Sequence, residues 1–150
     1  MQNCFFIVAI MVISLSSTAQ AGDSMNSVRI CNQVWMTYNL DVRTYRNGDP
    51  IPQVRDTTAL SNSTTGAWCW YNNDSVTYAP IYGKLYNWYA VNDPRGLAPQ
   101  DWHVPGYAEW TTLITCLGGY KAAGGKMKST ARWKAPNKGT TNHRLSVSQF

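Results

Sequence analysis

GYAEWTTLITCLGG, residues 106–119, is the stretch that predicts the fold of this chain most firmly. Gly106 is an acceptable N-cap, and Glu109 falls at the third helical position, where its carboxylate can reach the free amides of the first turn. The pair Gly118-Gly119 is typical of a helix end. Between these ends, apolar residues recur at the spacing of one helical face: Trp110, Leu113, Ile114 and Leu117. The pattern predicts an amphipathic helix.

Short extended segments are expected on the N-terminal side of this helix, and Trp102–Pro105 is the nearest of them. Val28–Leu40 has the composition of a strand that enters the domain, and Asn32-Gln33 could form a hairpin turn within it. A second strand is expected over Asp41–Tyr45. The even positions of the first strand share one face: Val28, Ile30, Val34 and Met36.

The middle of the chain alternates between turns and aromatic runs. Arg46–Pro52 has turn chemistry, because Asn-Gly tolerates positive φ and proline cannot donate to a β-ladder. The polar chain from there to Gly66 predicts a long surface loop. Ala67–Tyr71 is a β-prone aromatic run, and Tyr82–Val91 has apolar residues at helical spacing, which predicts a second helix. The residues after Gly119 predict a looser, basic stretch.

The N-terminus has the pattern of a secretory signal peptide, residues 1–21. Phe5–Leu15 is almost wholly apolar, and a small-x-small site ends at Ala21. We expect cleavage between Ala21 and Gly22, which leaves residues 22–150 as one domain. The apolar run is shorter than the roughly 20 residues that span a bilayer. The sequence therefore predicts a secreted or cell-surface protein with no transmembrane segment after signal removal.

Charge and cysteine content exclude several classes of site. The net charge is +5, but scattered lysines usually form a solvated face and an exported protein seldom meets nucleic acid, so we expect no nucleic-acid partner. Signal removal would leave three cysteines, an odd number whose pairing the sequence leaves open: Cys31, Cys69 and Cys116. The two histidines do not lie at zinc-ligand spacing from them, so no metal site is assigned.

Two aromatic runs, Trp68–Tyr71 and Tyr86–Tyr89, are candidates for carbohydrate binding, because a flat ring suits the apolar face of a pyranose. For any one of these aromatic residues we prefer the interpretation that it belongs to the core, since about half of each run must point inward in a regular element. The stronger ligand candidates are two aromatic residues and the polar run that follows them: Trp70, Tyr71, Asn72, Asn73 and Asp74.

No cofactor and no catalytic residue is assigned, and calcium is kept only as an alternative. Glu109 stands where a helix-capping carboxylate belongs, and His103 beside Trp102 has the features of a structural histidine. Asn and Asp oxygens suit calcium, but the same side chains bond their own backbone in turns, which is the interpretation we adopt. The residues concerned are Asp49, Asn72, Asn73, Asp74, Asn92 and Asp93.

Several phrases, in this order and spacing, resemble the Fibrobacter succinogenes major paralogous domain over about residues 28–142. They are Gln33–Met36, Thr44–Pro52, Gly66–Cys69, Tyr71–Asp74, Tyr82–Pro99, Trp102–Pro105 and Ala108–Leu113. The last two are also similar to a phrase of the formylglycine-generating fold. The resemblance implies an α+β, C-type-lectin-like architecture in which two helices flank small twisted antiparallel sheets with long loops.

The departures from the family pattern concern cysteines and the C-terminus. Members usually have Gly at the position of Cys31 and no Cys at that of Cys116, and their domain continues beyond Asn142. The resemblance therefore implies a domain that is incomplete at its C-terminus. We expect a non-catalytic binding module for polysaccharide or a cell-surface glycan. The alternatives are a formylglycine-generating-type enzyme relative and a non-functional truncated fragment.

Overall fold

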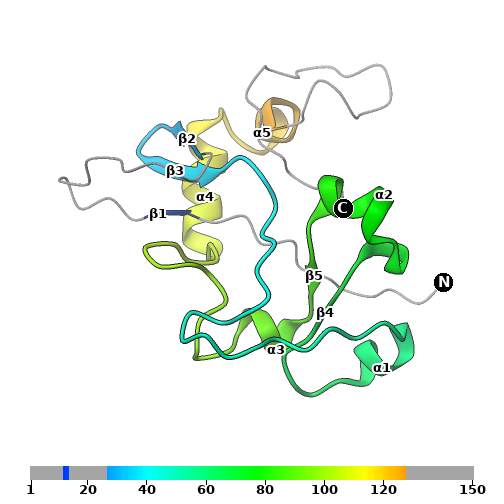
Figure 1. The fold of residues 1–150 in the computed structure, drawn as a ribbon. Coiled ribbons are helices and arrows are strands. Elements are labelled where there is room, and N and C mark those ends of the chain that lie inside the picture. Colours follow the sequence, from blue (N-terminus) through cyan, green and yellow to red (C-terminus); the bar gives the residue numbers. More distant parts are fainter. Residues whose placement is uncertain (1–11, 14–26, 128–150) are drawn as a thin grey trace. The chain divides into compact units, whose positions relative to one another are not determined.

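The computed structural model describes residues 12–13 and 27–127, which divide into two compact units. We call Asn39–Val104 the aromatic unit, and the described residues 12–13, 27–38 and 105–127 the helical unit. Each unit combines helices with a small antiparallel sheet, so the α+β class is confirmed (Figure 1). The described residues form five α-helices, more than the two expected. The cleavage positions Ala21 and Gly22 lie outside the described residues.

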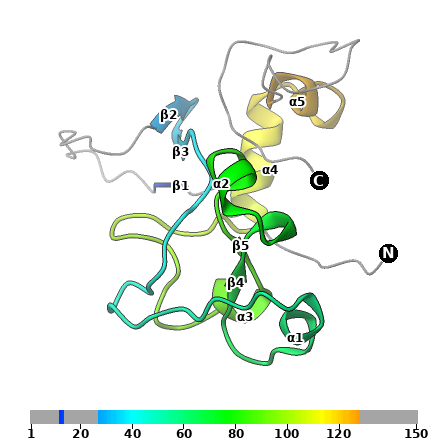
Figure 2. The same cartoon turned by 45° about the vertical axis from the view of Figure 1, so that its right-hand side comes forward.

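The helical unit is a three-stranded antiparallel sheet with two helices. The hairpin of β2 (Ser27–Ile30) and β3 (Gln33–Met36) is extended by the two-residue β1 (Val12–Ile13), in the order β1-β3-β2. The helices are α4 (Tyr107–Cys116) and α5 (Tyr120–Met127), which pack against each other (Figure 2). Helix α5 occupies the part of the chain in which a looser stretch was expected, so that prediction was wrong.

The hairpin turn lies one residue earlier than predicted, at Cys31-Asn32, and Cys31 has φ 53°. Val28 pairs with Trp35, so these two side chains share a face of the sheet. The predicted common face of Val28, Ile30, Val34 and Met36 is therefore wrong. The two turn residues reverse the chain, so Val34 and Met36 lie on the opposite face from Val28 and Ile30.

Helix α4 confirms the helix predicted between Gly106 and Gly119. Glu109 Oε2 accepts a hydrogen bond from Gly106 N at 2.8 Å, and Gly118 and Gly119 end the helix with φ values of 96° and 87°. The apolar side of α4 packs on the Val28 face of the hairpin and on α5. The buried residues of this core are Ile30, Trp35, Leu113, Leu117 and Ala123.

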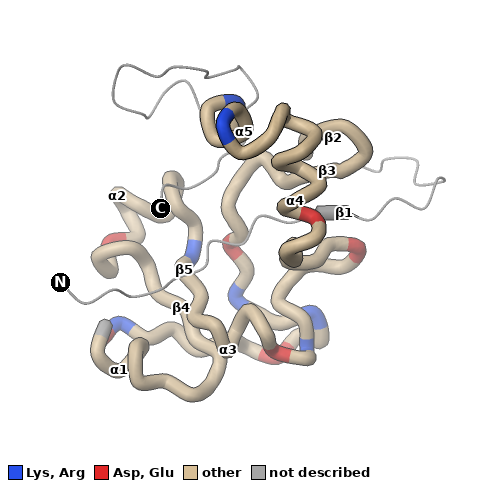
Figure 3. Tube along the Cα trace, turned by 180° about the vertical axis from the view of Figure 1, so that it is seen from behind, with Lys and Arg blue, Asp and Glu red and all other residues tan. Residues whose placement is uncertain are grey.

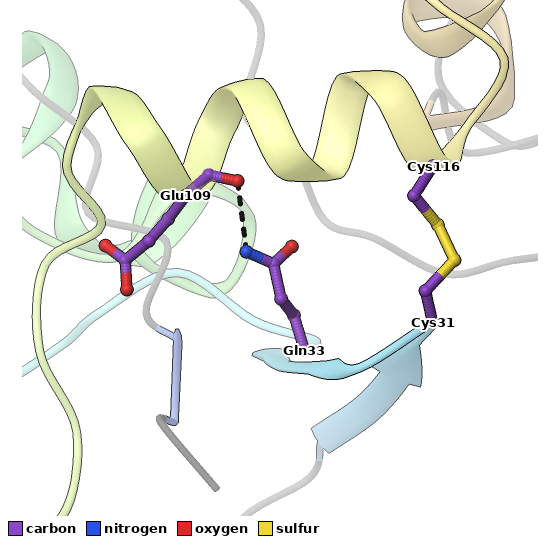
Figure 4. Close-up of a disulfide and its surroundings, with 4 residues drawn as sticks. All are labelled: Cys31, Gln33, Glu109 and Cys116. Atoms are coloured by element: carbon purple, nitrogen blue, oxygen red, sulfur yellow. Dashed lines mark hydrogen bonds between the residues drawn. A yellow bond between two sulfur atoms is a disulfide. The ribbon is translucent and has the colours of Figure 1, made fainter.

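A disulfide joins the hairpin turn to the last residue of α4 (Figure 4). Cys31 and Cys116 are 6.6 Å apart at Cα and 85 positions apart in sequence. A second link between the same two elements joins the first residue of β3 to the first turn of α4, where Gln33 Nε2 donates to the Glu109 carbonyl at 3.0 Å. The pairing that the sequence left open is thus Cys31 with Cys116. Cys69 is buried in the aromatic unit.

The aromatic unit is built on a short ribbon of two antiparallel strands, β4 (Trp68–Cys69) and β5 (Leu85–Tyr86). Between them the chain forms the 3-10 turn η1 (Tyr71–Asn73) and helix α2 (Ser75–Tyr82), and helix α3 (Trp88–Val91) follows β5. The β-prone run at Ala67–Tyr71 is confirmed in its centre by β4.

Two predictions in the N-terminal half of this unit were wrong. The expected surface loop contains α1 (Thr57–Asn62), which begins where Asp56 Oδ1 accepts bonds from the amides of Thr58 and Ala59 at 2.8 and 2.9 Å. The strand expected over Asp41–Tyr45 is absent from the described chain, which has there a single bridge between Thr44 and Pro50.

The helix expected over Tyr82–Val91 is also wrong in its first two thirds. Gly83, with φ 62°, ends α2, and Leu85 and Tyr86 pair with β4 as a strand. Tyr82 is the last residue of α2, and after it only the last four residues, Trp88–Val91, are helical. They form α3, which begins where Asn87 Oδ1 accepts from Ala90 N at 3.0 Å. Cross-strand pairing therefore overrides the helical spacing of the aromatic residues.

The turn at Gly83 supplies a first testable prediction. A Cβ at this position would lie 2.8 Å from the Leu40 carbonyl oxygen, in a backbone conformation that L-residues rarely adopt. Gly83→Ala should lower the free energy of unfolding by about 2 kcal/mol, measured by urea denaturation. Gly48→Ala is the matched control, because Gly48 also has positive φ but has no atom within 4 Å of an added Cβ. Equal losses in the two variants would contradict a close contact at Gly83.

Candidate functional site

The five residues predicted from sequence as ligand candidates lie together where β4 ends. Trp70 follows β4, Tyr71, Asn72 and Asn73 form η1, and Asp74 is the N-cap of α2. Trp70 and Asp74 are half-buried and the other three are exposed. With two tyrosines of α2 they form what we call the aromatic surface: Trp70, Tyr71, Asn72, Asn73, Asp74, Tyr78 and Tyr82.

Three tyrosine rings make up the centre of the aromatic surface. The Tyr71 ring meets the Tyr78 ring edge-on, with centroids 5.0 Å apart, and lies tilted against Tyr82 at 5.2 Å. Tyr78 and Tyr82 are stacked, with centroids 5.9 Å apart, because residues four apart share one face of a helix. Tyr71 keeps 45% of its surface exposed while two neighbours restrict its ring.

Sequence reasoning missed Tyr78 and assigned Tyr82 to a different helix. The available signals were Asp74 as an N-cap and the four-residue spacing of the two tyrosines. Pro80 obscured them, because a proline inside a short segment usually argues against a helix there.

The polar residues of the aromatic surface fix its backbone. Asp74 Oδ1 accepts a hydrogen bond from Thr77 N at 3.0 Å, and this bond lowers the pKa of the Asp74 carboxyl. Asn73 Nδ2 donates to the Arg55 carbonyl, and both Asn72 and Asn73 have positive φ, near 51° and 56°. Asp74 therefore bonds nearby backbone as the sequence predicted, whereas the Asn73 side chain bonds a carbonyl 18 positions away and the Asn72 side chain is exposed.

A lysine that sequence reasoning missed lies beside the two tryptophans of this region. The Lys84 side chain is 1% exposed, and its Nζ donates to the carboxylate and, at 3.0 Å, to the backbone oxygen of Asp41. The same Nζ lies 4.7 Å from the Trp70 ring centroid and 4.8 Å from that of Trp68. The two rings meet edge-on at 5.2 Å, so the ammonium and the two indoles form one cluster.

In the second aromatic run, Tyr86–Tyr89, the preferred core interpretation is confirmed for Tyr86 and wrong for Trp88 and Tyr89. Tyr86 is fully buried, its hydroxyl donates to the Val42 carbonyl at 2.7 Å, and burial raises the pKa of that hydroxyl. Trp88 and Tyr89 are 56% and 45% exposed. Because β4 and β5 are antiparallel, these two lie at the opposite end of the ribbon from Trp70.

The other acidic candidates bind an arginine instead of converging on a vacant site. Arg95 donates to Asp93 Oδ2 at 2.8 Å and to Asp49 Oδ2 at 3.0 Å, and its guanidinium lies 4.0 Å from the Tyr45 ring centroid. The hydrogen bonds from Arg95 lower the pKa of the Asp93 carboxyl. Residues 12–13 and 27–127 contain no group of three or more His, Cys, Asp or Glu that could hold a metal ion. In Figure 3 the charged positions are spread along the chain.

Comparison with known proteins identifies the family. The family model of the Fibrobacter succinogenes major domain matches residues 28–148. The chain belongs to this family. The match to the Fibrobacter succinogenes major domain continues past residue 142, where the resemblance was expected to end. The matched residues include the whole aromatic surface. Neither the curated proteins nor the solved structures contain a match. Across the part of the chain described here, no helix is long and apolar enough to span a bilayer.

Proposed function

We propose that this chain is a non-catalytic binding module, secreted or attached at the cell surface, that recognises polysaccharide or a cell-surface glycan through the aromatic surface. A C-type-lectin-like architecture and an export signal at residues 1–21 are parts of the same proposal. The observation that supports it best is Tyr71, a large ring that is 45% exposed and yet restrained by Tyr78 and Tyr82.

A restrained, exposed ring suits carbohydrate for two physical reasons. A pyranose with equatorial substituents presents a face of C–H groups, which can pack on a flat aromatic ring. Tyrosine offers a large contact area with few rotatable bonds, so little conformational entropy is lost when the ligand is bound. The exposed amide of Asn72 beside Tyr71 can donate to and accept from sugar hydroxyls.

Neither the charged side chain of the aromatic surface, Asp74, nor the lysine that contacts its tryptophan, Lys84, favours an acidic glycan. The Asp74 carboxyl has a lowered pKa and is therefore negatively charged at neutral pH. The ammonium of Lys84 is buried and paired with Asp41, so it is not presented to a ligand. The carboxylate of a uronic acid would therefore be repelled by the Asp74 carboxylate, and Lys84 is too deeply buried to bind it.

Tyr71→Ala tests the proposal. We expect it to weaken binding of cellohexaose, a soluble oligosaccharide of equatorially substituted pyranoses, by at least about tenfold in isothermal titration calorimetry. A glycan array with neutral and acidic polysaccharides would first establish whether other oligosaccharides bind more tightly. Tyr107→Ala is the matched control, because Tyr107 is 82% exposed but belongs to the helical unit.

Three results would count against the proposal. Equal affinity of the Tyr71→Ala and unchanged chains for every glycan would remove the aromatic surface as the site. Turnover of any ligand would favour the alternative, a formylglycine-generating-type enzyme relative. A thermal melt without a cooperative transition would favour the other alternative, a non-functional truncated fragment.

A further inference from the structure

Lys84 is buried where an apolar side chain of similar length would fill the space without desolvating a charge. Burial of an ammonium is unfavourable unless a partner compensates for the lost hydration, and replacing a buried ion pair by apolar residues is often neutral or stabilising. The ion pair with Asp41 compensates only in part for the lost hydration of the ammonium, because the Asp41 side chain is 51% exposed and strongly hydrated. Stability alone therefore does not explain a lysine at this position.

The position of the ammonium is tightly specified by the surrounding chain. Lys84 N donates to the Leu40 carbonyl at 3.4 Å, and Asn39 Nδ2 donates to the Ile81 carbonyl at 3.2 Å. These bonds fix the segment that carries Asp41 beside the start of β5. Asp41 then holds Lys84 Nζ through both its carboxylate and its backbone oxygen.

The fixed ammonium acts on the one tryptophan of the aromatic surface. A cation near a tryptophan ring is attracted by the negative charge above the ring face, and the attraction is greater when water is excluded. Lys84 Nζ is 4.7 Å from the Trp70 centroid, and Trp70 also meets the buried Trp68 edge-on. The half-buried Trp70 ring is thus restrained from its inner side by Lys84 and Trp68.

We propose that Lys84 is a positioning residue of the aromatic surface: its buried ammonium, held by Asp41, fixes the Trp70 ring so that the surface is formed before a ligand arrives. This inference rests on the proposed function for its effect on affinity. A preformed surface binds more tightly because the entropy of ordering Trp70 is lost during folding and not during binding.

Lys84→Met tests this role, because methionine keeps most of the apolar stem and removes the charge. We expect cellohexaose affinity to fall about tenfold, with a changed near-ultraviolet circular dichroism signal from the Trp68 and Trp70 rings. Lys121→Met, at an exposed lysine of the helical unit, is the control for the loss of one positive charge and should change neither. Asp41→Asn weakens the ion pair between Asp41 and Lys84 by a change at a half-exposed side chain. It serves as the second variant if Lys84→Met does not fold.

A double-mutant cycle with Trp70 separates positioning from a general structural effect. If Lys84 acts through Trp70, Lys84→Met should leave the affinity unchanged in a Trp70→Ala chain. It should also change the tryptophan signal less there, because only the contact of Lys84 with Trp68 remains. Equal losses with and without Trp70, or an unchanged affinity and signal, would overturn the inference. If the unchanged chain binds no glycan, the proposed function fails. The change in the tryptophan signal caused by Lys84→Met, compared between chains with and without Trp70, still decides whether Lys84 positions that ring.

Discussion

Loss of the Cys31–Cys116 disulfide should lower the free energy of unfolding of the helical unit by about 4 kcal/mol. The two cysteines are 85 positions apart, so the cross-link removes a large part of the conformational freedom of the unfolded chain. Folded domains of this size are stable by only about 5–15 kcal/mol, so the expected loss is a large share of the total. No other change proposed for this chain has a larger expected effect than this one.

The measurement is urea unfolding with and without a thiol reductant, followed by tryptophan fluorescence. Trp35 and Trp110, whose rings are 5.0 Å apart in the helical unit, provide the local signal. The double variant Cys31→Ser, Cys116→Ser should match the reduced chain and should not respond to reductant. An identical transition midpoint for oxidised and reduced chains would mean that the disulfide contributes nothing.

Local signals in the sequence were sufficient for α4. Its cap, its apolar face and its stop all lie within residues 106–119, and the structure confirms each of them. The run around β4 was also recognisable, because a short aromatic segment favours a strand wherever it finds a partner.

Predictions failed where pairing between distant segments decides the structure. The spacing of aromatic residues over Tyr82–Val91 fits a helix, but Leu85 and Tyr86 pair with Cys69 and Trp68 across the ribbon. The hairpin at Cys31-Asn32 reversed the expected face in the same way, because a turn of two residues changes which side chains lie opposite each other.

The candidate site shows the same division between local and distant information. Trp70 and Tyr71 were identifiable because an aromatic run adjoins a polar one. The importance of Lys84 depends on Asp41, which is 43 positions away, and nothing local marks that lysine as buried. The disulfide links positions 85 apart, and the pairing of three cysteines cannot be deduced from their spacing.

Trp35→Ala should lower the free energy of unfolding of the helical unit by about 4 kcal/mol, as much as loss of the disulfide. The Trp35 side chain is fully buried between the hairpin and α4, where it contacts the core residues and the Trp110 ring. Its removal would leave a cavity that the surrounding sheet and helix cannot close. The disulfide and the Gln33 hydrogen bond fix the position of the hairpin relative to α4, so neither element can move into the space.

Trp35→Phe should be much milder, with a loss of about 1–2 kcal/mol, for a reason that is specific to this site. The Trp35 Nε1 is buried and has no hydrogen-bond partner within the described ranges, so phenylalanine loses volume but also removes an unsatisfied donor. Tyr120→Ala, 74% exposed in the same unit, should change the unfolding free energy by less than about 0.5 kcal/mol. Chemical denaturation of the three variants ranks these losses. If phenylalanine were as destabilising as alanine, the indole nitrogen, and not the ring volume, would be what this core requires.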